Sequence, residues 1–174
     1  MNEQLSHNTT SFSKIEFPII LLLDNVTGEA NIGSLFRLAD AFGVKKLIFC
    51  GSKPNLSSNR LKRTARNTHN TVSYEFYESV LEIIPSYKKQ NYKVLGIEIT
   101  SNSELIGEIN CEAEDKVVLI AGNERHGISP EVLKECDNTY HIEMYGENSS
   151  MNVAQSVGIG LYELTKALKE FHRK

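Results

Sequence analysis

The stretch FPIILLLD, residues 17–24, and the segment NVTGEANIGSLFRLADAFGV that follows it, residues 25–44, decide the fold. The first is an apolar run of the kind that forms a strand buried on both faces, and it predicts a strand over Phe17–Leu23. The second predicts a helix over Ile32–Phe42, because its apolar residues recur on one helical face and Gly43 is a typical C-terminal stop. A buried strand that leads through a short turn into an amphipathic helix is typical of an α/β domain.

The rest of the chain repeats this alternation of strand and helix patterns. Further strands are predicted over Lys46–Cys50, Tyr92–Ile99, Lys116–Ala121 and Thr139–Ile142. Further helices are predicted over Tyr77–Gln90 with a bend or break at Pro85, from Ser129–Pro130 to Cys136, and over Val153–Phe171. The alternation predicts an α/β fold with a mainly parallel sheet and helices on both faces, in which ligands bind at the carboxyl ends of the strands.

The turn between the first strand and the first helix resembles a phosphate-binding loop, but it matches neither glycine fingerprint of nucleotide-binding proteins. Arg37 lies among the apolar positions of the helix. A guanidinium group is not buried without a partner, so Arg37 either forms a structural salt bridge or points into a polar cleft. Asn31 lies about one and a half turns away, and we expect both side chains to face one pocket at the amino end of the helix.

The composition indicates a single domain over residues 15–174 behind a flexible polar tail over residues 1–14. The three cysteines are far apart and form no C-x-x-C pair, which disfavours a disulfide framework or a zinc site and favours a reducing compartment. No apolar run is long enough to cross a bilayer, and the amino terminus lacks the apolar core of a signal peptide. We therefore expect a cytoplasmic protein with no metal and no membrane contact.

The formal net charge is −3, but the charges are unevenly distributed along the chain. No acidic residue lies between Asp40 and Glu75, whereas this window carries Lys45, Lys46, Lys53, Arg60, Lys62, Arg63 and Arg66. Such segregation is typical of a protein with a nucleic-acid-binding patch. A solvated loop that lacks acidic residues by chance explains the pattern equally well on this observation alone.

Two later loops carry polar residues at the ends of predicted strands. The segment LIAGNERHGISPEVL places Glu124 between Gly122 and Gly127, where backbone amides and a carboxylate can meet a flat ligand. An ordinary strand-to-helix turn with incidental charges is the alternative. The segment GENSSMNV places Ser150 and Asn152 directly before the last helix, where both residue types commonly act as helix caps.

Taken together, three motifs resemble the SPOUT superfamily, specifically the SpoU/TrmH family of RNA 2′-O-ribose methyltransferases. They are NIGSLFR for N-x-G-x-x-x-R, GNERHG for G-N-E-x-x-G, and SMNV for S-[LM]-N-V, in the same order and spacing as in the family. The resemblance implies a homodimer, a deep C-terminal trefoil knot and S-adenosylmethionine held by the loops of that knot. It also implies an RNA substrate, and the GNERHGI loop is most similar to the branch that methylates the D-loop guanosine of tRNA.

The resemblance also implies the residues of the site. Those expected to bind the cofactor are Ile97, Glu98, Gly122, Ile142, Met144, Ser150 and Met151. Those expected at the acceptor and catalytic site are Asn31, Arg37, Glu124, Ser150 and Asn152. The basic residues expected to contact RNA phosphates are Arg60, Lys62, Arg63 and Arg66.

Methyl transfer to a ribose hydroxyl is an in-line displacement, so the protein must place the 2′-oxygen and help its proton to leave. Arg37 could bind the adjacent phosphate, lower the pKa of the hydroxyl, or act as the base; we favour electrostatic positioning because the pKa of arginine is very high. The other acceptor residues would orient Arg37 and the ribose, and Glu124 would hold the arginine or the substrate. The family usually has Ile-Pro-Met where this chain has Ile142-Glu143-Met144, so a carboxylate is added beside the cofactor loop.

Three functions remain open from the sequence. The first is a tRNA ribose methyltransferase, the second is the same activity on ribosomal RNA, and the third is a catalytically silent RNA-binding relative. The presence of Asn31, Arg37 and Glu124 argues against the third. A nucleotide-dependent oxidoreductase would need a glycine fingerprint that the chain does not contain.

Overall fold

A computed structural model describes residues 5, 10 and 12–170 of the chain. Most of the tail predicted over residues 1–14, and residue 171 at the end of the predicted last helix, lie outside the described residues. Among the described residues, no helix is long and apolar enough to cross a membrane.

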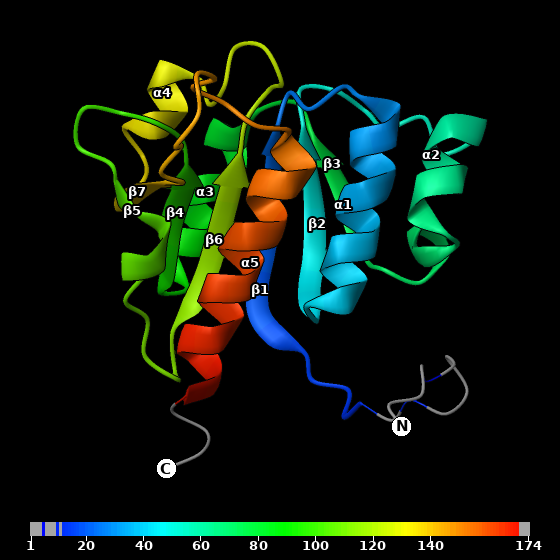
Figure 1. Cartoon of the computed structure of the whole chain (residues 1–174), viewed down its shortest axis with the longest axis horizontal. Helices are drawn as coiled ribbons and strands as arrows, with labels where there is room; N and C mark the ends of the chain where they lie inside the picture. Colours follow the sequence, from blue (N-terminus) through cyan, green and yellow to red (C-terminus); the bar gives the residue numbers. More distant parts are fainter. Residues whose placement is uncertain (1–4, 6–9, 11, 171–174) are drawn as a thin grey trace.

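The centre of the molecule is a seven-stranded parallel sheet with the strand order β3-β2-β1-β6-β4-β7-β5 (Figure 1). The strands are β1 Phe17–Asp24, β2 Val44–Cys50, β3 Tyr74–Tyr77, β4 Tyr92–Ile97, β5 Glu104–Leu105, β6 Lys116–Ala121 and β7 Asn138–His141. The central strands β1 and β6 are apolar and buried on both faces, as parallel sheets require.

Helices cover both faces of the sheet, which confirms the predicted α/β architecture. They are α1 Glu29–Ala41, α2 Asn59–Ala65, α3 Val80–Lys89, α4 Pro130–Leu133 and α5 Val153–Glu170. Alternate residues of β1 enter two different cores: Leu21 packs with α1 and α5, whereas Leu22 packs with α3 and α4. Helix α2 lies outside α1 rather than against the sheet, and the two helices are side by side (Figure 1).

The structure differs from the prediction around α3. Tyr77, predicted to begin the helix, ends the edge strand β3, and α3 begins after Ser79. The Oγ atom of Ser79 accepts a hydrogen bond of 3.2 Å from the amide of Leu81, so the cap sets the start of the helix. Pro85 lies inside a continuous helix rather than at a break.

Helix α4 is shorter than predicted, and Ser129 has another role than capping. Ser129 and Pro130 do occupy the cap and first helical positions, but the helix ends at Leu133. The Oγ atom of Ser129 donates a hydrogen bond of 3.0 Å to Oδ2 of the buried Asp24, and the Ser129 amide donates another of 3.1 Å. These bonds fasten the end of β1 to the segment after β6.

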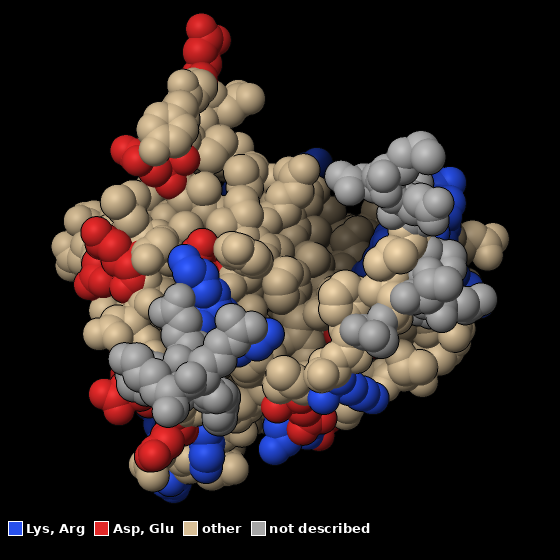
Figure 2. Space-filling model, turned by 60° about the horizontal axis from the view of Figure 1, so that its bottom comes forward, with Lys and Arg blue, Asp and Glu red and all other residues tan. Residues whose placement is uncertain are grey.

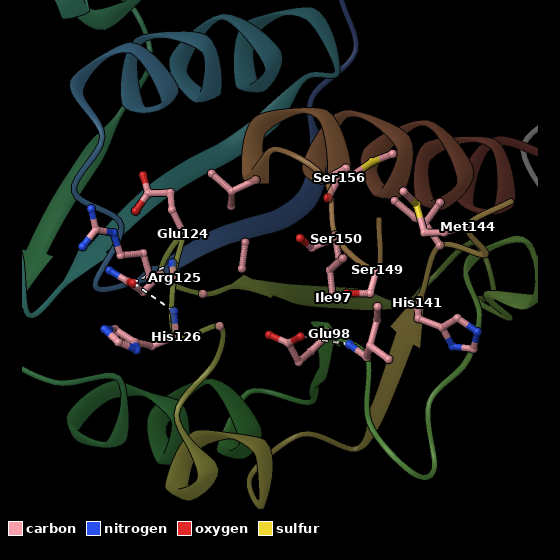
Figure 3. Close-up of a pocket in the computed structure, with 18 residues that line it drawn as sticks. Ile97, Glu98, Glu124, Arg125, His126, His141, Met144, Ser149, Ser150 and Ser156 are labelled. Atoms are coloured by element: carbon pink, nitrogen blue, oxygen red, sulfur yellow. Dashed lines mark hydrogen bonds between the residues drawn. The ribbon is translucent and has the colours of Figure 1, made fainter. Parts of the chain in front are cut away.

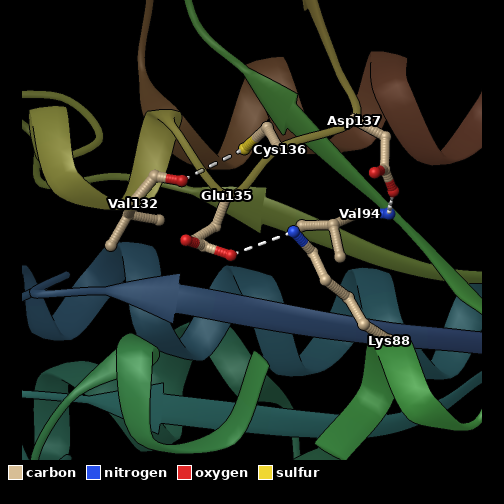
Figure 4. Close-up of polar contacts among 6 residues, drawn as sticks. All are labelled: Lys88, Val94, Val132, Glu135, Cys136 and Asp137. Atoms are coloured by element: carbon tan, nitrogen blue, oxygen red, sulfur yellow. Dashed lines mark hydrogen bonds and ion pairs between the residues drawn. The ribbon is translucent and has the colours of Figure 1, made fainter. Parts of the chain in front are cut away.

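A second set of contacts fastens α3 and β4 to the segment after α4 (Figure 4). Lys88 forms an ion pair of 2.9 Å with Glu135, and Oδ2 of Asp137 accepts a hydrogen bond of 2.7 Å from the amide of Val94. Together with the Asp24 contacts, they hold the segment between β6 and β7 from both ends.

Gly33 allows α1 and α2 to approach closely. A Cβ atom at Gly33 would lie 2.0 Å from Oγ1 of Thr64 and 2.4 Å from the carbonyl oxygen of Leu61. Gly33 lies inside α1 and faces α2. The position of α2, which carries the predicted RNA-contacting residues, therefore depends on it.

We expect Gly33→Ala to lower the free energy of unfolding by about 1–3 kcal/mol, because α2 must shift to accommodate the methyl group. Thermal or denaturant unfolding measures this loss. Gly107→Ala is the matched control, since nothing lies within 4 Å of a Cβ atom there. Equal stability of the two variants would contradict the close helix contact.

Candidate functional site

Four loops meet at the carboxyl ends of β1, β6, β4 and β7, as the rule for open parallel sheets predicts. Three of them, the segments after β4, β6 and β7, line a cavity of about 330 Å³ together with the start of α5 (Figure 3). The predicted cofactor residues all line it: Ile97, Glu98, Gly122, Ile142, Met144, Ser150 and Met151. The cavity combines apolar side chains with backbone amides and a few polar groups, which is typical of a cofactor site.

The turn from Gly122 to Gly127 is closed by its own backbone. The amide of Asn123 donates to the carbonyl of Gly127 over 3.0 Å, and the amide of Gly127 donates back over 2.9 Å. Oδ1 of Asn123 accepts hydrogen bonds from the amides of Arg125 and His126. Gly127 has a φ of +66°, a conformation that side chains with a Cβ atom rarely adopt.

Gly122 is needed for a different reason, which is the close approach of backbone to backbone. A Cβ atom on it would lie 2.1 Å from the carbonyl carbon of Gly127 and 2.2 Å from the amide nitrogen of Ile128. The turn folds back directly over Gly122, so this position has no room for a side chain.

Glu124 binds the amino-terminal end of α1. Its Oε1 atom accepts hydrogen bonds from the amide of Gly28 over 2.8 Å and from Nδ2 of Asn31 over 3.0 Å. Its Oε2 atom accepts from the amide of Thr27 over 3.3 Å and from the Thr27 hydroxyl over 3.5 Å. Helix α1 has no side-chain cap at Gly28, so Glu124 supplies from another loop the acceptor that a helix start lacks.

The pKa of Glu124 lies below its usual value. Desolvation raises the pKa of this carboxyl, but the hydrogen bonds from Asn31 and from backbone amides, including those of Gly28 and Thr27, outweigh that effect. Glu124 is therefore a carboxylate at neutral pH. It is poorly suited to deliver a proton.

Asn31 links this network to the third loop. Its Oδ1 atom accepts a hydrogen bond of 2.8 Å from Nδ2 of Asn152. Oδ1 of Asn152 in turn accepts hydrogen bonds from the amides of Ala154 and Gln155 at the start of α5. Asn152 is thus a helix cap, as predicted, and it also contacts Asn31.

Arg37 is placed apart from this network. It is exposed on α1, lines neither cavity, and has no hydrogen bond or ion pair with any residue that the structure describes. The pocket shared with Asn31 is not seen in the single chain, because six helical positions turn a side chain by about 240°. The structural salt bridge is not seen either, and Glu124 contacts the helix start rather than Arg37.

Ser150 lies in the wall of the cavity, whereas the added carboxylate of Glu143 does not. The Glu143 side chain accepts a hydrogen bond of 2.7 Å from the hydroxyl of Tyr145. Both of these side chains are exposed, so the carboxylate points away from this cavity.

A second cavity, of about 420 Å³, lies on the other side of the Gly122–Gly127 turn. It is lined by Thr27, Gly28 and Asn31 from the start of α1 and by Asn123, Glu124, Arg125 and His126 from the turn. The last four residues line both cavities, so the two spaces share one wall. Arg125 and His126 were not among the predicted site residues, although two cationic or polar residues between closely spaced glycines were a signal.

The predicted RNA-contacting residues lie together on one helix. Arg60, Lys62 and Arg63 belong to α2, and Arg66 follows it in a left-handed conformation. All four are exposed and form no ion pair with a residue of the described part of the chain. Ser58 caps this helix and donates a hydrogen bond of 2.6 Å to Glu29 of α1, which ties the basic helix to the start of α1.

The cysteine thiols are not part of this site. Burial is the main cause that raises the pKa values of Cys50 and Cys136 to about 12, and that of Cys111 to about 11. Such thiols are protonated and unreactive at neutral pH. In residues 5, 10 and 12–170, no group of three or more His, Cys, Asp or Glu residues could hold a metal ion.

The two cavities lie on either side of a Gly-Asn-Glu turn, and this part of the chain also matches a known protein family. The model of the SpoU rRNA Methylase family matches residues 18–162. The chain belongs to the SpoU rRNA Methylase family. The matched range contains all three motifs, both cavities and the basic helix, so the family covers the whole candidate site.

Two relatives and one solved structure illustrate the range of this SpoU family. The chain is 29% identical over 148 residues to a 23S rRNA (guanosine-2′-O-)-methyltransferase of Neisseria meningitidis, covering 85% of this chain and 58% of the relative. It is 26% identical over 173 residues to a tRNA (guanosine(18)-2′-O)-methyltransferase of Aquifex aeolicus, covering 98% and 79%. A crystal structure of an AdoMet-bound rRNA methyltransferase of Sinorhizobium meliloti superposes with a TM-score of 0.79 at 25% identity, covering 90% and 59%. The chain thus spans less than two thirds of two of these three proteins.

Proposed function

We propose that the chain transfers a methyl group from S-adenosylmethionine to a ribose 2′-hydroxyl of RNA. The observation that carries the proposal is the shared wall between two cavities, one lined by the predicted cofactor residues and one by Asn31 and Glu124. Both named relatives are 2′-O-methyltransferases that act on guanosine in RNA.

The residues of the first cavity fit S-adenosylmethionine. Ile142, Met144 and Met151 provide apolar surface for the adenine, and the Gly122–Gly127 turn provides backbone at close range. When bound, the cofactor supplies an electrophilic methyl group on a positively charged sulfur. The solved structure of the Sinorhizobium protein contains AdoMet on the same fold, which supports this assignment.

The residues of the second cavity fit the acceptor nucleotide. Asn31 is held on one side by Glu124 and on the other by Asn152, so its amide has a fixed orientation beside the shared wall. Glu124 orients this group and the start of α1 instead of holding Arg37. Placing the acceptor oxygen in one position is itself a large part of the catalysis of an in-line displacement.

We also propose the homodimer and the trefoil knot that the resemblance implies. The exposed position of Arg37, outside both cavities of the single chain, supports a site that a second copy completes. In such a site Arg37 would bind the phosphate next to the acceptor ribose, and the guanidinium would lower the pKa of the hydroxyl.

The favoured substrate is tRNA, at a D-loop guanosine, and the alternative is ribosomal RNA. The Aquifex tRNA enzyme aligns with nearly the whole chain, which supports tRNA, whereas the Neisseria relative is an rRNA enzyme of similar identity. Mapping of ribose methylation in total RNA from cells that lack this protein decides between them. Loss of a D-loop signal supports tRNA, loss of a ribosomal signal supports rRNA, and unchanged methylation contradicts both.

The basic helix α2 is the proposed RNA-contacting surface. On the face that Figure 2 turns forward, the visible Lys and Arg side chains of the described residues are mixed with Asp and Glu. The exposed basic residues of α2 are instead joined to α1, whose start forms the second cavity.

We expect joint replacement of Arg60, Lys62, Arg63 and Arg66 by alanine to weaken RNA binding and to flatten its dependence on salt. Each lost phosphate contact should reduce the slope of log K against log salt by about 0.7–0.9. Titration of RNA at several salt concentrations measures the slope. Replacement of Lys88, Lys93 and Lys166, three lysines that form ion pairs elsewhere, is the control and should leave the slope unchanged, whereas an unchanged slope in the α2 variant rejects this surface.

A further inference from the structure

Glu98 follows β4, lines the proposed cofactor cavity and binds two backbone amides, those of Ile99 and Ile128. Its Oε1 atom accepts a hydrogen bond of 3.0 Å from the amide of Ile99, and its Oε2 atom accepts one of 3.0 Å from the amide of Ile128. The carboxylate also packs against Gly127, where a Cβ atom would lie 2.2 Å from Oε2. The side chain is therefore held in one orientation between the loops after β4 and β6.

These two bonds leave hydrogen-bonding capacity on the carboxylate. A carboxylate has about four lone-pair sites, two on each oxygen. One site on each oxygen of Glu98 is taken by an amide, and no other hydrogen bond reaches it from the described residues. One acceptor site remains on each oxygen, at the spacing that suits two neighbouring hydroxyl groups.

The sheet order places Glu98 in the middle of the cavity. Strand β4 lies between β6 and β7, so Glu98 stands between the Gly122–Gly127 turn and the apolar residues that follow β7. Figure 3 shows this order, with Arg125 and His126 on one side of Glu98 and Met144 on the other. The polar side adjoins the acceptor cavity, where the reacting methyl group must lie, and the apolar side suits the adenine.

We propose that the Glu98 carboxylate binds the 2′- and 3′-hydroxyl groups of the cofactor ribose and thereby sets the position of the sulfonium relative to the acceptor cavity. This inference rests on the proposed function, because the connectivity of S-adenosylmethionine puts the ribose between the base and the sulfur. Glu98 is then a cofactor-positioning residue, and its amide partners fix the orientation in which it receives the diol.

The test compares the dissociation constants of S-adenosylmethionine and of its 2′-deoxy and 3′-deoxy analogues by calorimetry. For the unmodified protein, we expect removal of either hydroxyl to weaken binding about 10- to 100-fold, the range for a hydrogen bond to a charged group. In Glu98→Ala we expect the three ligands to bind within about threefold of one another. Glu98→Gln keeps the side-chain shape but replaces one acceptor by a donor, so discrimination against at least one analogue should fall.

Ser129→Ala is the matched control, because it removes an anchor of the same loop, the bond to Asp24, without touching the cavity. It should retain the full discrimination between the three ligands. Full discrimination in Glu98→Ala, or an equal loss of affinity for all three ligands, would overturn the ribose assignment. If the unmodified protein binds none of them, the proposed function itself fails, so the two failures are distinguishable.

Discussion

Replacement of Arg37 by alanine is expected to lower the rate of methyl transfer about 10²- to 10³-fold, while the dissociation constant of S-adenosylmethionine stays unchanged. The rate falls because a positioned cation that stabilises developing negative charge contributes about this factor. The cofactor affinity is unchanged because Arg37 lines neither cavity and contacts no described residue of the site. Single-turnover kinetics and calorimetry on the same preparation measure the two quantities.

Arg37→Lys is the control that separates charge from shape. Lysine keeps the positive charge but loses the planar fork that binds a phosphate with two hydrogen bonds, so we expect an intermediate rate. An equal loss of cofactor binding in Arg37→Ala would contradict the acceptor-side role. A rate within about twofold of the unmodified protein would show that Arg37 takes no part in the reaction.

Replacement of Gly122 by alanine should have the largest effect on cofactor binding. The new Cβ atom would meet backbone atoms of Gly127 and Ile128 at 2.1–2.3 Å, and backbone cannot rotate away as a side chain can. We expect the turn to shift, the affinity for S-adenosylmethionine to fall at least about tenfold, and the free energy of unfolding to drop by about 1–3 kcal/mol.

Gly146→Ala is the matched control for this substitution. Gly146 lies in the loop between β7 and α5, close in sequence to Met144, but nothing lies within 4 Å of a Cβ atom there. Calorimetry should therefore show a lower cofactor affinity for Gly122→Ala than for Gly146→Ala, and thermal unfolding should show a lower stability. Unchanged cofactor affinity in Gly122→Ala would contradict the tight turn as part of the cofactor site.

The sequence was most informative about the strands, which hydrophobic periodicity reveals, and about the location of the site, which lies at the carboxyl ends of the strands. Apolar runs such as Phe17–Leu23 located five strands, and the placement of ligands at the carboxyl ends of strands located the cavity. The prediction missed β3, β5 and α2, because the two strands are short and lie at the edges of the sheet, and the helix buries only Leu61 and Ala65. Short elements of this kind depend on partners distant in the chain, such as the contact of Ser58 with Glu29.

The candidate site was predictable as a set of residues but not as a set of contacts. Glu124 binds the backbone amides of Thr27 and Gly28. Backbone amides occur at almost every position, so a sequence does not indicate which of them a side chain will bind. Asn31 and Asn152 could be named from their motifs, but their mutual hydrogen bond joins the start of α1 to a loop more than a hundred residues away. The orientation of Arg37 away from the cavities could be anticipated from helix geometry. Arg37 lies six positions after Asn31, and side chains at that spacing do not lie on the same face of a helix.

The most direct measurement is methyl transfer by the purified protein to RNA, with S-adenosylmethionine labelled in its methyl group and with tRNA and ribosomal RNA as separate substrates. The proposed function predicts that digestion to nucleosides leaves the label on a 2′-O-methylated nucleoside, and that in the undigested RNA the linkage 3′ to that ribose resists alkaline cleavage. We expect this product from the unmodified protein and its near absence from Arg37→Ala. Label on a nucleobase, or no label with either RNA, would contradict ribose methylation by this chain.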